Sequence, residues 1–226
     1  MKLFQLNADR ARADFARQGY VHVRGGVTPE FLALACARIR RVLGTDPEHV
    51  GGNAANKEQF RFELDDARAA QDEVFQVFGH LAGLDPATLT LSERHVNAYR
   101  DTAVPLPVPH KDRRASQVTI GLSIDIPEGS HLVLWPSLER GENCYDSAAD
   151  LYAALPPVSR PEQALQGAPE VVLHDRPGDV VVFAGSTTWH CRRNAAGTVN
   201  LFFKLNDFGD DPLGEDVRAG ERALAD

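Results

Sequence analysis

The segment Pro177-Gly178-Asp179-Val180-Val181-Val182-Phe183 joins a turn to four consecutive large apolar residues. A Pro-Gly-Asp turn followed directly by such a run is typical of a buried β-strand. Gly185 follows, and then His190, eleven residues after Asp179. The segment therefore predicts a core strand that leads into a histidine, which a β-fold can bring beside an earlier strand.

Short β-prone runs, separated by Pro, Gly and Asp, occupy most of the chain from Leu91 onward. The predicted strands are Leu91–Tyr99, Gln117–Ile126, His131–Trp135, Val171–Leu173, Val180–Phe183 and Val199–Leu205. An insertion, residues 139–167, interrupts them with a helix around Ala148–Leu155 and a Pro-rich loop. Several short strands of this kind predict a β-sandwich or jelly roll.

The first 90 residues have helical signals instead. The expected elements are a helix from a cap at Asn7 or Asp9 to Gly19, a strand Tyr20–Val23, a helix from Thr28-Pro29-Glu30 to about Leu43, and a helix Asp66–Gly83. Residues 45–60 are expected to form a connecting loop. We predict a mostly β domain with N-terminal helices (α+β), in which residues 1–90 support a jelly-roll core of residues 91–207.

Length and composition indicate one domain over residues 1–226 and exclude several partners. The formal charge of −8 argues against nucleic acid, and no apolar run approaches the roughly 20 residues that span a bilayer. The N-terminus lacks the pattern of a signal peptide, so a cytoplasmic location is expected. The three cysteines are widely spaced, which predicts free thiols. A small-molecule substrate is the expected partner, and the oligomeric state is left open.

His110-Lys111-Asp112 is the first part of a candidate metal site. In an extended segment residues two apart point to the same side, so both side chains can bind one ion. The pattern alone is weak, because 8 histidines and 32 acidic residues in 226 give about one such pair by chance. Its position, after the Pro105–Pro109 segment and before a predicted strand, favours a site at the mouth of the β-structure.

His190 is the second part. A jelly roll can bring its late strand beside His110 and Asp112, which would complete a set of two histidines and one carboxylate. Such a set leaves coordination positions open and is typical of non-haem Fe(II) enzymes. For a lone histidine the default interpretation is a packing residue, and here the preceding strand favours a metal ligand.

Four segments together resemble the phytanoyl-CoA dioxygenase-like group of iron(II)/2-oxoglutarate oxygenases. They are Phe15–Glu30, His110–Asp112, Gly129–Pro136 and Pro177–Asn194, and they occur in the family's order over nearly the whole chain. The resemblance implies a double-stranded β-helix, a form of jelly roll, with Fe(II), 2-oxoglutarate and O₂ as cofactor and co-substrates. Small tailoring oxygenases of natural-product pathways, including those of orthosomycin antibiotics, are similar.

One family feature is missing. The family places an arginine about ten or eleven residues after the distal histidine, where it binds the far carboxylate of 2-oxoglutarate. Asn200 and Leu201 stand there in this sequence. Lys204, on the same strand face as Asn200, is the predicted substitute, because a cation among apolar residues needs an anionic partner. Arg192, Arg193 and Arg94 are alternatives.

The resemblance also implies that Asn97 and Thr119 contact the co-substrate. Arg113, Arg193 and Trp189 lie near the proposed metal ligands in the sequence, and we expect them to contact the substrate. The polar residues near the proposed metal favour a hydrophilic substrate.

The expected activity is therefore oxidation of a C–H bond of a hydrophilic small molecule, by hydroxylation or oxidative ring closure. A sugar-containing antibiotic precursor is one candidate substrate. The alternative is a non-catalytic or 2-oxoglutarate-independent cupin-like metal-binding protein, and the missing arginine is its main support.

Overall fold

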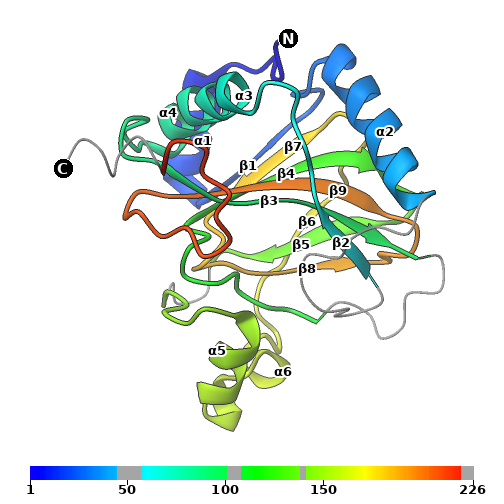
Figure 1. Ribbon diagram of the computed structural model, residues 1–226. Helices are drawn as coiled ribbons and strands as arrows, with labels where there is room; N and C mark the ends of the chain where they lie inside the picture. Colours follow the sequence, from blue (N-terminus) through cyan, green and yellow to red (C-terminus); the bar gives the residue numbers. More distant parts are fainter. Residues whose placement is uncertain (45–56, 101–107, 138–140, 220–226) are drawn as a thin grey trace.

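Two antiparallel β-sheets lie one above the other in the computed structural model (Figure 1), which describes residues 1–44, 57–100, 108–137 and 141–219. The larger sheet has the order β1 (Tyr20–Val23), β7 (Val180–Phe183), β4 (Val118–Asp125), β9 (Val199–Asn206), β3 (Thr90–Tyr99) and β2 (Lys57–Arg61). The smaller sheet has the order β6 (Val171–Leu173), β5 (His131–Trp135) and β8 (Trp189–Arg193). This arrangement is the predicted jelly roll, a double-stranded β-helix.

Helices cover the outer face of the larger sheet (Figure 1). They are α1 (Ala8–Gln18), α2 (Pro29–Leu43), α3 (Ala67–Val74), a π-helical turn (Phe75–Gly79) and α4 (His80–Ala82). Asn7 and Thr28 cap α1 and α2, as predicted, because their side-chain oxygens accept hydrogen bonds from free backbone N–H groups in the first turn. Gly19 ends α1 with φ 78°, a conformation that favours glycine.

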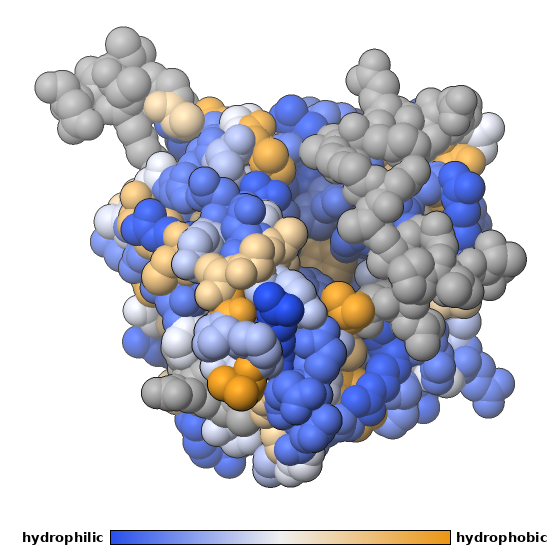
Figure 2. Space-filling model, turned by 90° about the horizontal axis from the view of Figure 1, so that it is seen from below, coloured by the Kyte–Doolittle hydropathy of each residue, from blue (hydrophilic) through white to orange (hydrophobic). Residues whose placement is uncertain are grey.

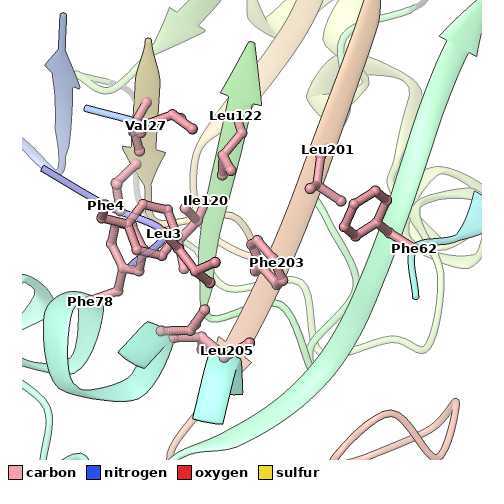
Figure 3. Close-up of a cluster of buried hydrophobic side chains, with 14 of the residues drawn as sticks. Leu3, Phe4, Val27, Phe62, Phe78, Ile120, Leu122, Leu201, Phe203 and Leu205 are labelled. Carbon is pink, nitrogen blue, oxygen red and sulfur yellow. The ribbon is translucent and has the colours of Figure 1, made fainter. Parts of the chain in front are cut away.

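The main core lies between these helices and the larger sheet. On β9, Leu201, Phe203 and Leu205 point into it, where they meet residues such as Phe4 and Phe78 (Figure 3). Because successive side chains of a strand point to opposite faces, Asn200, Phe202 and Lys204 necessarily face the space between the two sheets. The apolar half of each strand thus fixes where its polar half points.

Two strands of the structure are absent from the sequence prediction. β2 begins at Lys57, inside the segment expected to be a loop; residues 45–56 of that segment lie outside the described part. β8 was missed because its inward positions carry His190 and Arg192, so it has no apolar run. The expectation that residues 1–90 only support the core was also incomplete, since β1 and β2 form the edges of the larger sheet.

The insertion after β5 lies below the smaller sheet (Figure 1). It contains α5 (Ala148–Ala154), a 3₁₀ turn (Pro157–Ser159) and α6 (Pro161–Ala164). Leu151 of α5 packs against Val133, Trp135 and Cys191, on the outer face of that sheet. Within the described ranges, no helix combines the length and the apolar character needed to cross a bilayer.

Replacing Phe203 by alanine tests the packing of β9. The ring is fully buried, so the cavity left behind should lower the free energy of unfolding by about 3–5 kcal/mol. Phe208→Ala is the matched control; its ring is 39% exposed, and its loss should cost less than about 1 kcal/mol. Chemical denaturation measures both. Equal losses in the two variants would contradict this assignment of the core.

Candidate metal centre

His110, Asp112 and His190 come together at one end of the space between the sheets. One potential ligand atom from each lies within 4.8 Å of the others. The two histidines form an isolated antiparallel bridge, in which His110 N donates to His190 O at 3.0 Å and His190 N donates to His110 O at 2.9 Å. The backbone thus fixes the separation of the two rings, whose centroids are 4.4 Å apart.

Both imidazoles are oriented by the backbone. His110 Nδ1 donates to the carbonyl of Val108, and His190 Nδ1 donates to the carbonyl of Thr188, each at 3.0 Å. A proton on Nδ1 leaves the lone pair on Nε2, the atom available to a metal. Burial is the main cause that lowers the pKa of His110, to about 3, and it also lowers the pKa of His190. Both rings are therefore neutral near pH 7, as metal ligands must be.

Asp112 completes the set and is held as a carboxylate. Its Oδ2 accepts a hydrogen bond from Thr119 Oγ1 at 2.6 Å, and its Oδ1 accepts one from Lys204 Nζ at 2.9 Å. Burial alone would raise the pKa of Asp112, but Lys204 and then the two histidines keep it well below its ordinary value. The carboxylate is therefore ionised near pH 7.

Gly185 lies directly against this carboxylate. Its carbonyl accepts a hydrogen bond from Asp112 N at 3.0 Å. A Cβ at this position would lie 2.8 Å from Asp112 Oδ2 and 2.7 Å from Ser116 O, and it would also overlap Thr119 Oγ1. Only a residue without a side chain allows Asp112 and Thr119 to keep this hydrogen bond.

The three candidate ligands line a cavity of about 740 Å³ between the sheets. Volumes of roughly 300–1,000 Å³ are typical of small-molecule sites. Figure 2, viewed from the side of α5 and α6, shows a mostly hydrophilic surface with hydrophobic residues scattered over it. Val108 and Tyr152 line the cavity and are 63% and 38% exposed, which places them at its mouth.

A charged cluster lies beside Asp112. Lys204 Nζ is 3.3 Å from Glu93 Oε2, and Arg113 Nε is 3.0 Å from Glu93 Oε1. Burial opposes ionisation of Glu93, yet Lys204, His95 and Arg113 lower its pKa to about 2. Lys204 therefore has two carboxylate partners, and these raise its pKa although burial would lower it.

Most of the predicted site residues line the cavity. Asn97 faces it from β3, and its Oδ1 is buried without a hydrogen-bond partner in the described structure. Thr119 faces it from β4, but its hydroxyl is bound to Asp112. Trp189 and Arg113 are also part of the wall, and the ammonium of Lys111 lies 5.3 Å from the centre of the Trp189 ring.

Two of the predicted arginines do not reach the cavity. Arg193 lies on the opposite face of β8 from His190, where it pairs with Glu170 at 2.5 Å. Arg94 lies on the outer face of β3 and pairs with Glu215 at 3.4 Å. We correct both assignments on the basis of strand alternation. Arg192 does face the cavity, and both of its terminal nitrogens bind Asp175, at 3.0 and 2.7 Å.

Sequence reasoning missed Lys57, Glu93 and Asp175, all of which line the cavity. Glu93 was detectable, because it shares a strand face with Asn97. Lys57 lay in a segment without periodicity, and Asp175 follows a strand of only three residues, so no sequence signal marked either one.

No protein-family model and no curated protein matches the chain by sequence. Among solved structures, it is similar to the non-haem α-ketoglutarate-dependent epimerase SnoN from nogalamycin biosynthesis. The identity is 22% over 88% of this chain and 83% of SnoN, with a TM-score of 0.63. The carbocyclase SnoK of the same biosynthesis has 17% identity over 88% and 85% of the two chains and a TM-score of 0.65.

A prolyl-4-hydroxylase from Pseudomonas putida is also similar, with 14% identity over 88% of this chain and 97% of that enzyme and a TM-score of 0.61. A second SnoN structure contains Fe³⁺, α-ketoglutarate and nogalamycin RO. At these identities the likeness establishes the fold, which agrees with the predicted double-stranded β-helix.

Gly185→Ala tests the close approach to Asp112. The added Cβ should push the carboxylate out of position and weaken binding of a divalent metal by at least about tenfold, a loss typical of disturbed outer contacts. Gly141→Ala is the matched control, since its Cβ would meet no atom within 4 Å. Calorimetric titration with the metal measures the affinity of both variants. Unchanged affinity in Gly185→Ala would show that the clash is relieved elsewhere.

Proposed function

We propose that this protein is an Fe(II)- and 2-oxoglutarate-dependent oxygenase that oxidises a C–H bond of a hydrophilic small molecule. The observation that carries the proposal is the cluster of His110, Asp112 and His190 at the wall of a cavity large enough for a co-substrate and a substrate. The resemblance to the phytanoyl-CoA dioxygenase-like family remains part of this proposal.

The donor set fits iron(II). Two neutral imidazoles and one carboxylate form a set of mixed nitrogen and oxygen ligands, and thiolate is absent from the described cluster. Such a set, with positions left open, is preferred by non-haem Fe(II), whereas structural zinc sites are usually closed by four protein ligands. The hydrogen bonds from His110 and His190 to backbone carbonyls give the second layer of support that metal sites require.

When bound together, Fe(II), 2-oxoglutarate and O₂ supply the oxidising power, with conversion of 2-oxoglutarate to succinate and CO₂. The protein holds Asp112 ionised through Thr119 and Lys204 and keeps both imidazoles neutral. Residues of both sheets line the cavity and limit the access of bulk water, and Asn97 offers a buried amide oxygen to a bound molecule. Positioning and exclusion of water are thus the contributions of the chain itself.

The walls of the cavity suggest the substrate class. Its inner end is lined by charged and amide side chains, whereas its mouth has Val108 and Tyr152. SnoN and SnoK, two proteins of the same fold, belong to nogalamycin biosynthesis. Both observations support a polar natural-product precursor, such as one that contains a sugar. Hydroxylation and oxidative ring closure are both compatible with this site.

Turnover of 2-oxoglutarate tests the proposal. Protein supplied with Fe(II), 2-oxoglutarate and O₂ should form succinate, at least slowly, without added substrate. His110→Ala and His190→Ala should each lower iron affinity more than about 100-fold, because they remove a ligand rather than an outer contact. His174→Ala is the control, since its exposed ring lies outside the cavity.

Two results would contradict the proposal. Tight iron binding without any succinate would instead favour the cupin-like metal-binding protein. Unchanged iron affinity in both ligand variants would exclude this metal centre.

A further inference from the structure

Four cationic side chains line the cavity, and three of them are already paired with carboxylates. Lys204 binds Asp112 and Glu93, and Arg113 binds Glu93. Arg192 binds Asp175 through both of its terminal nitrogens. Lys57 is the fourth, and among the described residues no hydrogen bond or ion pair involves its ammonium group.

Lys57 extends from β2, the edge strand beside β3, toward the candidate metal centre. Its charge lowers the pKa of His110 and of His190, in addition to the larger effect of burial. In turn, burial and then the charge of Lys204 lower the pKa of Lys57, while Asp112 raises it. Lys57 lines the same cavity as His110, Asp112 and His190, so its ammonium group and the candidate metal centre share one enclosed space.

Lys57 is half-buried, and an ammonium group partly removed from water without a partner raises the free energy of the folded protein. Packing of the aliphatic part of Lys57 does not explain why its charge faces the cavity, because a lysine on an edge strand can usually turn its ammonium group to solvent. The cost is recovered if an anion occupies the cavity next to it. Asn97 is one strand away, where it pairs in register with Gln59, and its buried Oδ1 lacks a partner; this acceptor can meet an ammonium or hydroxyl group, but not a carboxylate.

We propose that Lys57 binds the far carboxylate of 2-oxoglutarate. This inference rests on the proposed function and assigns to Lys57 the role that the sequence suggested for Lys204. A chelating 2-oxo acid would have its second carboxylate only a few bonds from the metal, inside the cavity that Lys57 also lines. Lys204 instead neutralises Asp112 and Glu93.

A comparison of two 2-oxo acids of equal chain length tests the proposal. 2-Oxoglutarate and 2-oxopentanoate share the chelating end, but only the first has a far carboxylate. Binding of each to the anaerobic Fe(II) protein is measured by calorimetry and by the visible absorption that a chelated 2-oxo acid produces. In Lys57→Met, the Kd for 2-oxoglutarate should rise about 10- to 100-fold, the range expected for a lost charge-assisted hydrogen bond. The Kd for 2-oxopentanoate should not change.

Two further variants complete the experiment. Lys57→Arg keeps the charge and should retain most of the preference for 2-oxoglutarate. Arg100→Met is the control. Arg100 pairs with Glu58, the neighbour of Lys57 on β2, but its side chain is 63% exposed, so its loss should change the Kd of neither acid. Thermal unfolding without ligand should show Lys57→Met to be at least as stable as the wild type, because the variant loses a half-buried charge that has no partner.

The outcomes separate the two proposals. If Lys57→Met weakens the binding of both acids equally, or of neither acid, the proposed role of Lys57 is wrong while the oxygenase proposal stands. If the wild-type protein with Fe(II) binds neither acid, the proposed function itself fails, and the role of Lys57 fails with it.

Discussion

The carboxylate of Asp112 is buried, and an ionised carboxylate is stable there only if hydrogen bonds and positive charge surround it. Thr119 and Lys204 supply these from β4 and β9, and the backbone of Gly185 leaves the necessary space. Lys204 also pairs with Glu93, and Arg113 pairs with Glu93 in turn, so two cations balance two carboxylates in this cluster. The two candidate histidine ligands then face a negative group whose position is fixed from three sides.

The alternation of side chains along the strands connects this cluster to the fold. On β9, Leu201, Phe203 and Leu205 bury their side chains against the helices, so the residues between them must face the cavity. A shift of one residue in register would turn Lys204 into the apolar core and expose Phe203 to the cavity. The packing of the helices therefore also determines the electrostatics of the site.

Sequence patterns predicted the apolar strands and the capped helices well, because burial and capping are local signals. Val180–Phe183 and the helix after Thr28 have the predicted bounds to within a residue. The patterns failed where function changes composition: β8 has His190 and Arg192 at its inward positions, and β2 is a polar edge strand.

The structure brings the three candidate ligands together, as the sequence led us to expect, and their role as ligands stays a prediction. Their surroundings were not predicted, because pairing such as that of Arg192 with Asp175 depends on tertiary contacts. The same limit applies to Lys57, whose importance appears only when the neighbouring cations are seen to be paired.

An anaerobic crystal structure of the protein with Fe(II) and 2-oxoglutarate tests the central claim most directly. We predict one iron ion bound by His110 Nε2, Asp112 and His190 Nε2, with the 2-oxo acid end of the co-substrate bound to the same ion. Iron bound elsewhere, or bound at this site with 2-oxoglutarate absent from the cavity at saturating concentration, would contradict it.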